Sequence, residues 1–274
     1  RTEDYGRTWT RLTTGQNGIP EDYPTRVVRE DPDREGLLYA GTEFGISISF
    51  DDGKHWQSFQ LNLPVTPVTD IKIHQKDLVL STMGRSFWIL DNVTPLHQIS
   101  ESEAKAPSHL YPPRDAYRMH YRTRSFGDSS EVPEYLQPGV MIDYLLAEKT
   151  EEAIRLEIRD ANGNTIRRFT SEKQDVSLEG LAFEDLVEAM KAVGGPTLPR
   201  SPGMNRFFWD MRHAGAWSGG SGFLSRGGPL VASGTYQAKL IVGDWIHTER
   251  FRVLMDPRVR EDGVTQADLE AQES

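Results

Sequence analysis

The chain has 274 residues, a length that allows two domains of ordinary size. Its formal net charge is −10, so it lacks the basic surplus with which proteins neutralise phosphates, and we expect no nucleic-acid partner. No apolar run approaches the roughly 20 residues of a membrane-spanning helix, and the 24 glycines and 16 prolines separate short strand-like runs, which favours an all-β architecture. The absence of cysteine excludes disulfides, thiolate metal sites and a cysteine nucleophile.

The first residues of the chain lie inside a repeated motif. The chain begins at Arg1, without a methionine and without a signal peptide. We therefore expect it to be the carboxy-terminal part of a longer protein, or one chain of a cleaved assembly.

Two short stretches, 47 residues apart, share one pattern of turn-forming and aromatic residues. Residues 2–9 (TEDYGRTW) read T-x-D-x-G-x-T-W, and residues 49–56 (SFDDGKHW) read S-x-D-x-G-x-x-W. In each, the aspartate is suited to accept hydrogen bonds from its own turn, the glycine supplies a positive φ, and the tryptophan opens the returning strand. A turn that recurs at this spacing is typical of β-propeller blades, whose repeats run about 40–50 residues. The shared residues are Thr2, Asp4, Gly6 and Trp9 in the first copy and Ser49, Asp51, Gly53 and Trp56 in the second.

These two stretches resemble the Asp-box, or bacterial-neuraminidase (BNR) repeat, of sialidase-like and sortilin-like propellers. The resemblance implies a propeller fold, whereas the box itself is a structural turn that proteins of many functions share. The lack of cysteine sets the chain apart from close sortilin homologues, whose propeller is followed by a cysteine-rich module.

Residues 1–100 are predicted to form the last blades of an incomplete propeller. After an outer strand at 10–12, one blade has strands at 26–29, 37–41, 45–50 and 56–61, and the next has strands at 68–73, 77–82 and 86–90 and an outer run near 96–99. The turn at 91–94 lacks the motif, so this blade is degenerate. Since a closed propeller takes about four to eight blades, we expect missing blades to cover sheet edges and an apolar flank that are otherwise exposed.

The second half is predicted to be a separate β domain. Residues 101–114 are predicted to be a linker, and residues 115–256 carry strands at 138–146, 153–159, 165–169, 205–211, 234–242 and 245–253. Asn162-Gly163 predicts a hairpin turn. This number and spacing of strands is that of an immunoglobulin-like sandwich. The remaining predictions are an insertion near 172–200 with one helix at 183–193, a glycine-rich loop at 215–228, and a tail at 257–274 with a short helix at 265–271.

This half resembles the Ig-like domain of flagellar-hook-capping proteins, through residues 154–163, 203–210 and 233–240. Together with the box-bearing blades and residues 82–91 and 255–259, the whole chain resembles the end of large secreted bacterial propeller proteins that are labelled glycosyl hydrolase-like or sortilin-like. The resemblance implies this architecture and a secreted or periplasmic location, and it leaves activity open.

Four residues are predicted to lie on the ligand face of the propeller. In propellers that face is surrounded by the loops between second and third strands and by the loops between blades, which here contain Glu43, Phe44, Asp70 and Arg85. Arg85 is suited to bind a substrate carboxylate bidentately, and Glu43 or Asp70 to act as an acid, a base or an acceptor for a sugar hydroxyl. The alternative is that Arg85 pairs with a carboxylate of the neighbouring blade and joins the two blades.

Three weaker patterns favour structural interpretations. Residues 160–164 (DANGN) imitate the start of a calcium loop, but the glycine is misplaced and Ser171 replaces the final glutamate, so a hairpin turn is the better interpretation. The histidines show no metal-binding spacing, and we expect no metal and no cofactor. Trp209 alternates with Phe207 as a core residue does, whereas Trp217 is the tryptophan to test for exposure and sugar stacking.

The sequence favours a non-catalytic structural and binding role, in which this part closes a propeller and docks an Ig-like domain on it. The expected partners are the remaining blades, on the same chain or on a companion chain, and a carbohydrate or a peptide. No residue is assigned a catalytic role. Two alternatives stay open: a sialidase-like or glucanase-like glycoside hydrolase with most of its catalytic residues on the missing blades, and a receptor-like propeller that holds a peptide by strand addition.

Overall fold

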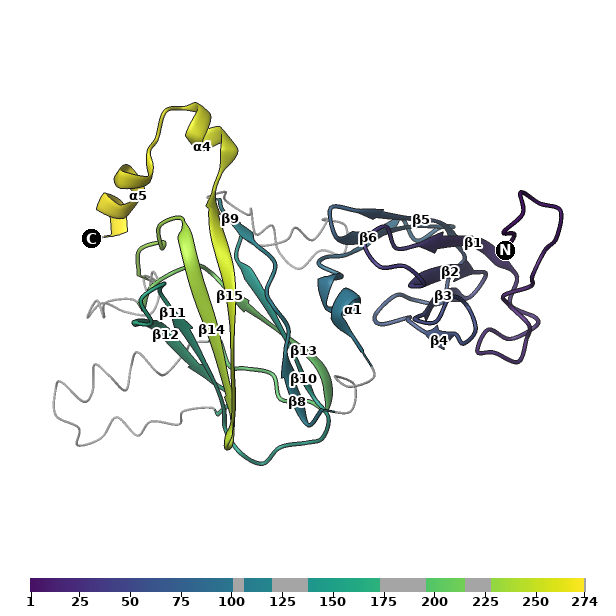
Figure 1. Ribbon diagram of the computed structural model, residues 1–274, viewed down its shortest axis with the longest axis horizontal. Coiled ribbons are helices and arrows are strands. Elements are labelled where there is room, and N and C mark those ends of the chain that lie inside the picture. The colour runs from purple at the N-terminus through teal and green to yellow at the C-terminus, as the bar shows by residue number, and fades with distance from the viewer. Residues whose placement is uncertain (101–105, 120–137, 173–195, 215–227, 274) are drawn as a thin grey trace. The chain divides into compact units, whose positions relative to one another are not determined.

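The chain folds into four β-sheets that belong to two compact units (Figure 1). The computed structural model describes residues 1–100, 106–119, 138–172, 196–214 and 228–273. Unit 1 spans Arg1–Gln98 and unit 2 spans Ile99–Ser274. The predicted all-β fold class is confirmed, since strands dominate both units and the described helices are short.

Unit 1 begins with a four-stranded antiparallel sheet of the kind that forms a propeller blade. Its strands lie side by side in chain order: β1 (Thr25–Glu30), β2 (Leu38–Thr42), β3 (Gly45–Ser49) and β4 (Gln57–Ser58). The three inner strands are found where the sequence predicts them. The fourth has only two residues, and it begins after Trp56 because the backbone N–H of Trp56 donates to Asn17 O (2.7 Å) and not to the neighbouring strand.

The second sheet of unit 1 has three antiparallel strands, again in chain order: β5 (Val68–His74), β6 (Asp77–Thr82) and β7 (Phe87–Leu90). The prediction of an outer strand near 96–99 is wrong, because helix α1 (Thr94–Gln98) lies there. The Asn92 side chain accepts hydrogen bonds from Thr94 N (3.4 Å) and Thr94 Oγ1 (2.7 Å), and Pro95 lies in the first helical turn. Proline favours a helix start, since its missing N–H has no partner there in any case.

The outer strand predicted at 10–12 is also absent. Thr10 pairs with Arg1 through two backbone hydrogen bonds (2.7 and 2.8 Å), and the chain then leaves the ladder. Leu12 turns into a small cluster with Ile19 and Trp56 that covers one face of the four-stranded sheet. The opposite face of that sheet packs on the second sheet around Tyr39, so both faces of the first sheet are covered.

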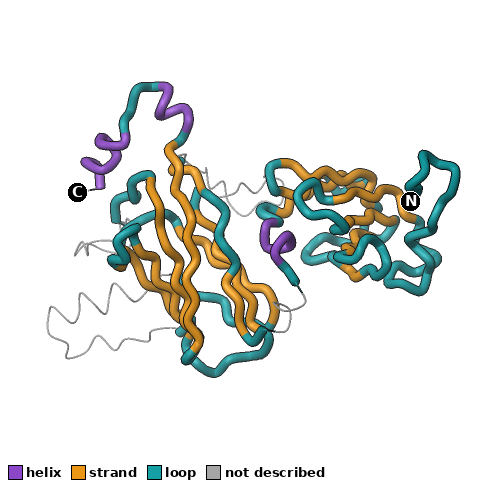
Figure 2. The backbone as a smooth tube through the Cα atoms, in the orientation of Figure 1, coloured by secondary structure: helices purple, strands orange, loops and turns teal. Residues whose placement is uncertain are grey.

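Unit 2 is a sandwich of two sheets, which Figure 2 draws as two layers of strands. The smaller sheet has the order β13-β10-β8 and the larger one the order β12-β11-β14-β15-β9, with β9 parallel to β15. The strands are β8 (Ser108–Leu110), β9 (Ala116–Arg118), β10 (Val140–Leu146), β11 (Ile154–Arg159), β12 (Thr165–Thr170), β13 (Gly203–Trp209), β14 (Gly234–Val242) and β15 (Trp245–Met255).

The core of the sandwich lies between the two sheets and is centred on Trp209. Trp209 is fully buried, as its alternation with Phe207 predicts, and its ring centroid lies 6.0 Å from that of Tyr236 and 6.1 Å from that of Phe251. Its indole N–H donates to Arg212 O (3.1 Å), which satisfies the polar atom of this large buried side chain. The turn at Asn162-Gly163 joins β11 to β12, with φ = 89° at Gly163.

Part of the predicted linker belongs to the sandwich. Strand β8 lies within residues 101–114 and pairs with β10, and its Leu110 and the following Tyr111 are buried. Because charged residues and prolines lie on both sides of these three residues, the sequence did not predict the strand. Most of the predicted insertion, the helix at 183–193 and Trp217 lie outside the described residues.

Two short helices end unit 2: α4 (Pro257–Glu261) and α5 (Gln266–Glu273). Thr265 and Asp268 cap α5 reciprocally: Asp268 Oδ2 accepts from Thr265 N (2.8 Å) and Thr265 Oγ1 accepts from Asp268 N (3.3 Å). Leu269 buries its side chain against Ala232 and Met255, which attaches α5 to the sandwich. In the described part of the chain, no helix has the length and apolar character needed to cross a membrane.

Candidate functional site

The second box-like turn is a closed network of hydrogen bonds around Asp51. Asp51 Oδ1 accepts from Ser49 Oγ (2.9 Å) and from the backbone N–H of His55 (2.8 Å). Ser49 Oγ accepts in turn from the N–H of Gly53 (2.9 Å). Asp52 and Gly53 have positive φ angles of 63° and 83°, which lets the turn close. The side chains of Ser49 and Asp51 are therefore both hydrogen-bonded within the turn.

The first copy forms the same turn. Asp4 Oδ1 accepts from Thr2 Oγ1 and from the N–H of Thr8 (both 2.9 Å), and Thr2 Oγ1 accepts from the N–H of Gly6 (2.7 Å). The strand pairing repeats as well, because Arg1 pairs with Thr10 as β3 pairs with β4 47 residues later, at Ile48 and Gln57. Residues 1–10 thus reproduce the hairpin between the third and fourth strands of the blade that follows.

The Asp51 carboxylate is held ionised by the turn it builds. Burial by itself raises the pKa of Asp51, but the hydrogen bonds from the His55 backbone and ring and from Ser49 outweigh it, and the pKa falls to about 2. The His55 Nδ1 atom lies 2.5 Å from Asp51 Oδ2. Bonds from the backbone and side chain of Thr8 likewise lower the pKa of Asp4. Both oxygens of each carboxylate accept hydrogen bonds within the turn, so these carboxylates stabilise turns.

The tryptophans of the two turns have opposite surroundings. Trp56 is only 5% exposed, packs against Ile19 and Leu38, and donates its indole N–H to Leu12 O (3.0 Å). Trp9 is 73% exposed, and its indole N–H donates back to Gly6 O (3.1 Å) in its own turn. The second turn is covered by the segment at 12–19, whereas no described residue covers the first in this way.

Glu43 and Phe44 lie in the turn between β2 and β3, and both are engaged. The Glu43 carboxylate pairs with Arg26, whose Nε lies 2.8 Å from Oε1. The Phe44 ring lies 4.3 Å from that of Tyr23, and both rings are exposed. The Glu43 N–H donates to Pro24 O (3.1 Å), so the two loops that carry these residues are joined by their backbones.

Asp70 and Arg85 have different surroundings. Asp70 lies on β5 and binds Arg29 of β1, with Arg29 Nη2 2.7 Å from Asp70 Oδ1. This ion pair connects the first strands of the two sheets, so the arginine that pairs with a carboxylate of the neighbouring sheet here is Arg29 and not Arg85. Arg85 lies in the exposed turn between β6 and β7 and, among the residues that the structure describes, its guanidinium makes no ion pair. The structure assigns no ligand to these four residues, and their placement on a ligand face stays a prediction.

The outward face of the β5–β7 sheet carries uncovered apolar side chains. Phe87 and Ile89 on β7 are 73% and 59% exposed, and Val79, which is paired with Ile89, is half-buried. The alternate residues Leu78, Leu80 and Trp88 point to the other face and pack against the first sheet. A strand that is apolar on both faces is typical of a sheet with neighbours on both sides.

A buried carboxylate that sequence reasoning missed ties α1 to the first sheet. Asp31 is 3% exposed, and its Oδ2 lies 3.1 Å from Tyr39 Oη and 2.9 Å from His97 Nε2. Burial, followed by the charge of Asp31, raises the pKa of Tyr39 far above its usual value. Asp33 lies close enough for a metal ion to join it to Asp31 and His97, but Lys76 Nζ pairs with Asp33 (3.0 Å) in that position. The cluster is a structural network that joins Asp31 to His97, which are 66 residues apart in the sequence.

The Asp160 turn also uses its carboxylate internally, as the hairpin interpretation predicts. Asp160 Oδ1 accepts from the N–H groups of Asn162 (2.9 Å) and Asn164 (2.8 Å), and Oδ2 accepts from the Asn164 side chain (2.8 Å). The Asn164 side chain is the main cause of the lowered pKa of Asp160.

Comparisons with known proteins leave the family open. No protein-family model matches the chain, and no curated protein matches it. Among solved structures the chain is similar to PorZ, described as an essential bacterial surface component of the type-IX secretion system of Porphyromonas gingivalis, at 14% identity and a TM-score of 0.24. The similarity covers 84% of this chain and 30% of that one, so the chain spans less than a third of that neighbour's length. Identity and TM-score are both too low for that protein's role to be transferred to this chain.

Proposed function

We propose that unit 1 is a non-catalytic structural part of an Asp-box propeller in an exported protein, completed by further blades of the same polypeptide or of a companion chain. In this proposal unit 2 is an Ig-like accessory domain. The observation that carries the proposal is the exposure of Phe87 and Ile89 on one face of β7, whereas Leu78, Leu80 and Trp88 on the other face of the same sheet are packed.

The two ends of unit 1 support the proposal in complementary ways. At one end β7 exposes Phe87 and Ile89, and at the other the first turn exposes Trp9, whose counterpart Trp56 is buried. Burial of a large apolar side chain is worth about 1.5–3 kcal/mol, so the exposure of Phe87, Ile89 and Trp9 favours association. Neighbouring blades of a propeller present this pair of surfaces to each other.

No observation in unit 1 favours the alternative of a sialidase-like or glucanase-like glycoside hydrolase. The two carboxylates predicted for the ligand face, Glu43 and Asp70, are paired with Arg26 and Arg29. The carboxylates of the turns at Asp4 and Asp51 are used within those turns. The proposal therefore assigns these acids structural roles.

A double substitution tests the proposal. We expect Phe87→Ser with Ile89→Ser to leave the free energy of unfolding of this chain by itself within about 0.5 kcal/mol, because both side chains are exposed. In the complete protein or complex as isolated from its source, the same change buries two hydroxyls against a neighbouring sheet, and we expect a loss of about 3 kcal/mol or more. Ile246→Ser, at an exposed position of β15, is the matched control. An equal, small effect in both contexts contradicts the proposal.

A further inference from the structure

The outward face of the larger sheet of unit 2 gathers basic side chains from four neighbouring strands. Strand pairing sets Glu157 of β11 opposite both Arg168 of β12 and Lys239 of β14, and it sets Gln237 opposite both Arg159 and Arg250. Since alternate residues of a strand share a face and adjacent strands lie about 4.8 Å apart, these side chains form one continuous surface. The basic face consists of Arg155, Arg159, Arg168, Lys239, Arg250 and Arg252.

Only two carboxylates among the described residues are paired with this basic face. Glu157 binds Arg159 and lies 3.4 Å from Arg168 and 3.9 Å from Lys239, and Asp115 binds Arg252 with an Oδ2–Nη2 distance of 2.5 Å. Burial by itself raises the pKa of Glu157, but the hydrogen bond from Arg159 and the surrounding positive charges outweigh it and hold the pKa below its usual range.

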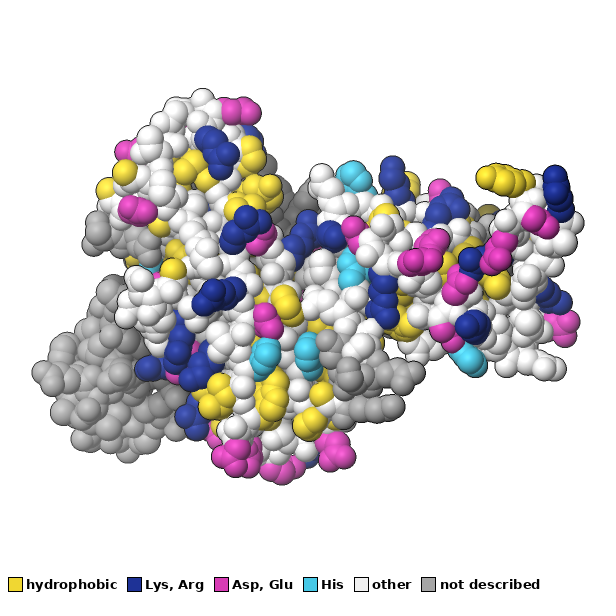
Figure 3. Space-filling view, in the orientation of Figure 1, with side chains coloured by type: hydrophobic (Ala, Val, Ile, Leu, Met, Phe, Trp, Pro, Cys, Tyr) yellow, Lys and Arg dark blue, Asp and Glu magenta, His cyan; other side chains and the backbone are white. Residues whose placement is uncertain are grey.

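Two of the arginines have no carboxylate of their own. Arg155 and Arg250 are exposed and, within the described part of the chain, make no ion pair. In a chain with a net charge of −10, such a concentration of unpaired positive charge on one sheet is unexpected from composition. Figure 3 shows Lys and Arg side chains following one another over the part of the sandwich formed by β14 and β15.

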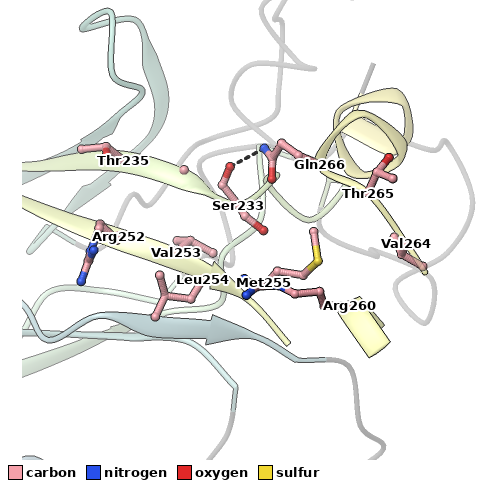
Figure 4. Close-up of a pocket in the computed structure, with 11 residues that line it drawn as sticks. Ser233, Thr235, Arg252, Val253, Leu254, Met255, Arg260, Val264, Thr265 and Gln266 are labelled. Atoms are coloured by element: carbon pink, nitrogen blue, oxygen red, sulfur yellow. Dashed lines mark hydrogen bonds between the residues drawn. The ribbon is translucent and has the colours of Figure 1, made fainter. Parts of the chain in front are cut away.

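A pocket opens at the end of the same face. It has a volume of about 520 Å³, within the range of about 300–1,000 Å³ that is usual for ligand sites, and it lies between the ends of β14 and β15 and the helices α4 and α5 (Figure 4). Arg252 belongs to both the basic face and the pocket, and Arg260 of α4 adds a second guanidinium. The described residues show no ion pair of Arg260.

The other groups in the pocket suit a sugar ring. Thr235, an exposed residue, carries a hydroxyl, and the Gln266 side chain, whose amide donates to Ser233 O (2.6 Å), lines the same space. Leu254 and Val264, both half-buried, supply apolar surface. Hydroxyl and amide partners, an apolar patch and arginines match the hydroxyls, the C–H face and the carboxylate of an acidic sugar.

We propose that unit 2 binds an acidic polysaccharide built from carboxylate-bearing sugars, a polyuronate. The chain of sugars lies along the basic face, and one sugar occupies the pocket with its carboxylate at Arg260, because the Arg252 guanidinium is already bound to Asp115. Five of the six cations of the basic face are arginines, whose planar guanidinium binds a carboxylate with two parallel hydrogen bonds. Among the described residues that line the pocket there is no aromatic side chain on which a nucleobase would stack, which favours a sugar over a nucleotide.

The experiment measures binding of the whole chain to polygalacturonate by calorimetry, beside a neutral glucan and a single-stranded DNA of similar length. We expect binding of polygalacturonate that weakens as salt rises, and no binding of the neutral glucan. The double variant Arg155→Gln with Arg250→Gln should weaken the affinity at least about tenfold, since a hydrogen bond to a charged group is worth about 1.5–3 kcal/mol. Arg260→Gln tests the pocket separately and should also weaken binding.

The control variant Arg7→Gln with Lys54→Gln removes two exposed charges of unit 1 and should bind as the unchanged chain does. Circular dichroism establishes that each variant is folded. The proposal is overturned if polygalacturonate does not bind, if the neutral glucan binds equally, or if control and basic-face variants lose affinity alike. Tighter binding of DNA than of polygalacturonate also overturns it, because the face is then a general polyanion surface.

Discussion

The pair Trp56 and Trp9 offers a test in which one chain supplies both the perturbation and its control. The two residues occupy the same place in the same turn, yet Trp56 is 5% exposed and Trp9 is 73% exposed. We predict that Trp56→Ala destabilises unit 1 strongly and that Trp9→Ala hardly affects it.

The magnitude follows from the burial of the ring. A tryptophan buries about 200 Å² when it is packed, which at about 25 cal/mol per Å² corresponds to about 5 kcal/mol for the side chain, and measured Trp→Ala changes in cores cost about 3–5 kcal/mol. The lost indole donor adds little, because Leu12 O still accepts from Asn17 Nδ2 (2.7 Å). Trp9→Ala should cost no more than about 0.5 kcal/mol, the usual range for exposed positions.

Native-state hydrogen exchange measures this difference without requiring the two units to unfold together. The amides of β2 and β3 report on the first sheet of unit 1, and those of β11 and β14 serve as an internal reference in unit 2. Equal losses of protection in Trp56→Ala and Trp9→Ala would refute the reasoning, which holds that the segment at 12–19 covers Trp56 and leaves Trp9 exposed. In a protein that supplies a preceding blade, the cost of Trp9→Ala should rise toward that of Trp56→Ala.

Three further predictions follow from the polar networks. The folded-state pKa of Asp51 lies at about 2, below the usual 3.8, so its contribution to stability is present above about pH 4 and is lost as the pH falls through 2. An acid titration of unit 1 by hydrogen exchange should show this loss, and Asp51→Asn should reduce it, leaving the part that is due to Asp4. Tyr39→Phe removes one donor from the buried Asp31 carboxylate and should cost about 1–3 kcal/mol in denaturant unfolding, and an unchanged stability contradicts the network. Arg85→Ala should change the unfolding free energy by less than about 0.5 kcal/mol, and a larger loss indicates a carboxylate partner.

The features that the sequence predicted well depend on local contacts. The two box turns follow from residues within eight positions of each other, because the aspartate, the hydroxyl and the glycine bond within one turn. The strands at 77–82 and 234–242 follow in the same way from alternation. The order of the strands within each sheet of unit 1 could be predicted because neighbouring strands are also consecutive in the chain.

The features that were missed depend on distant parts of the chain. Helix α1 replaces a predicted strand because Asn92 caps it and His97 reaches Asp31, and neither contact is visible in the apolar pattern at 96–99. Strand β8 has three residues and exists because β10 pairs with it. The alternating charges of β11 and β15 are visible in the sequence, but the basic face needs β14 between them, which only the sheet order reveals.

A single labelling experiment tests the central claim that another sheet covers β7. The chain contains no cysteine, so Ile89→Cys introduces one reactive thiol at a position that is 59% exposed, and Glu151→Cys gives an exposed reference in unit 2. In this chain by itself both thiols should react with a maleimide at similar rates. In the complete protein or complex the thiol at position 89 should be protected at least about a hundredfold relative to the reference, as expected for a buried site that opens at a cost of about 3 kcal/mol or more. Equal labelling of both positions there contradicts the account.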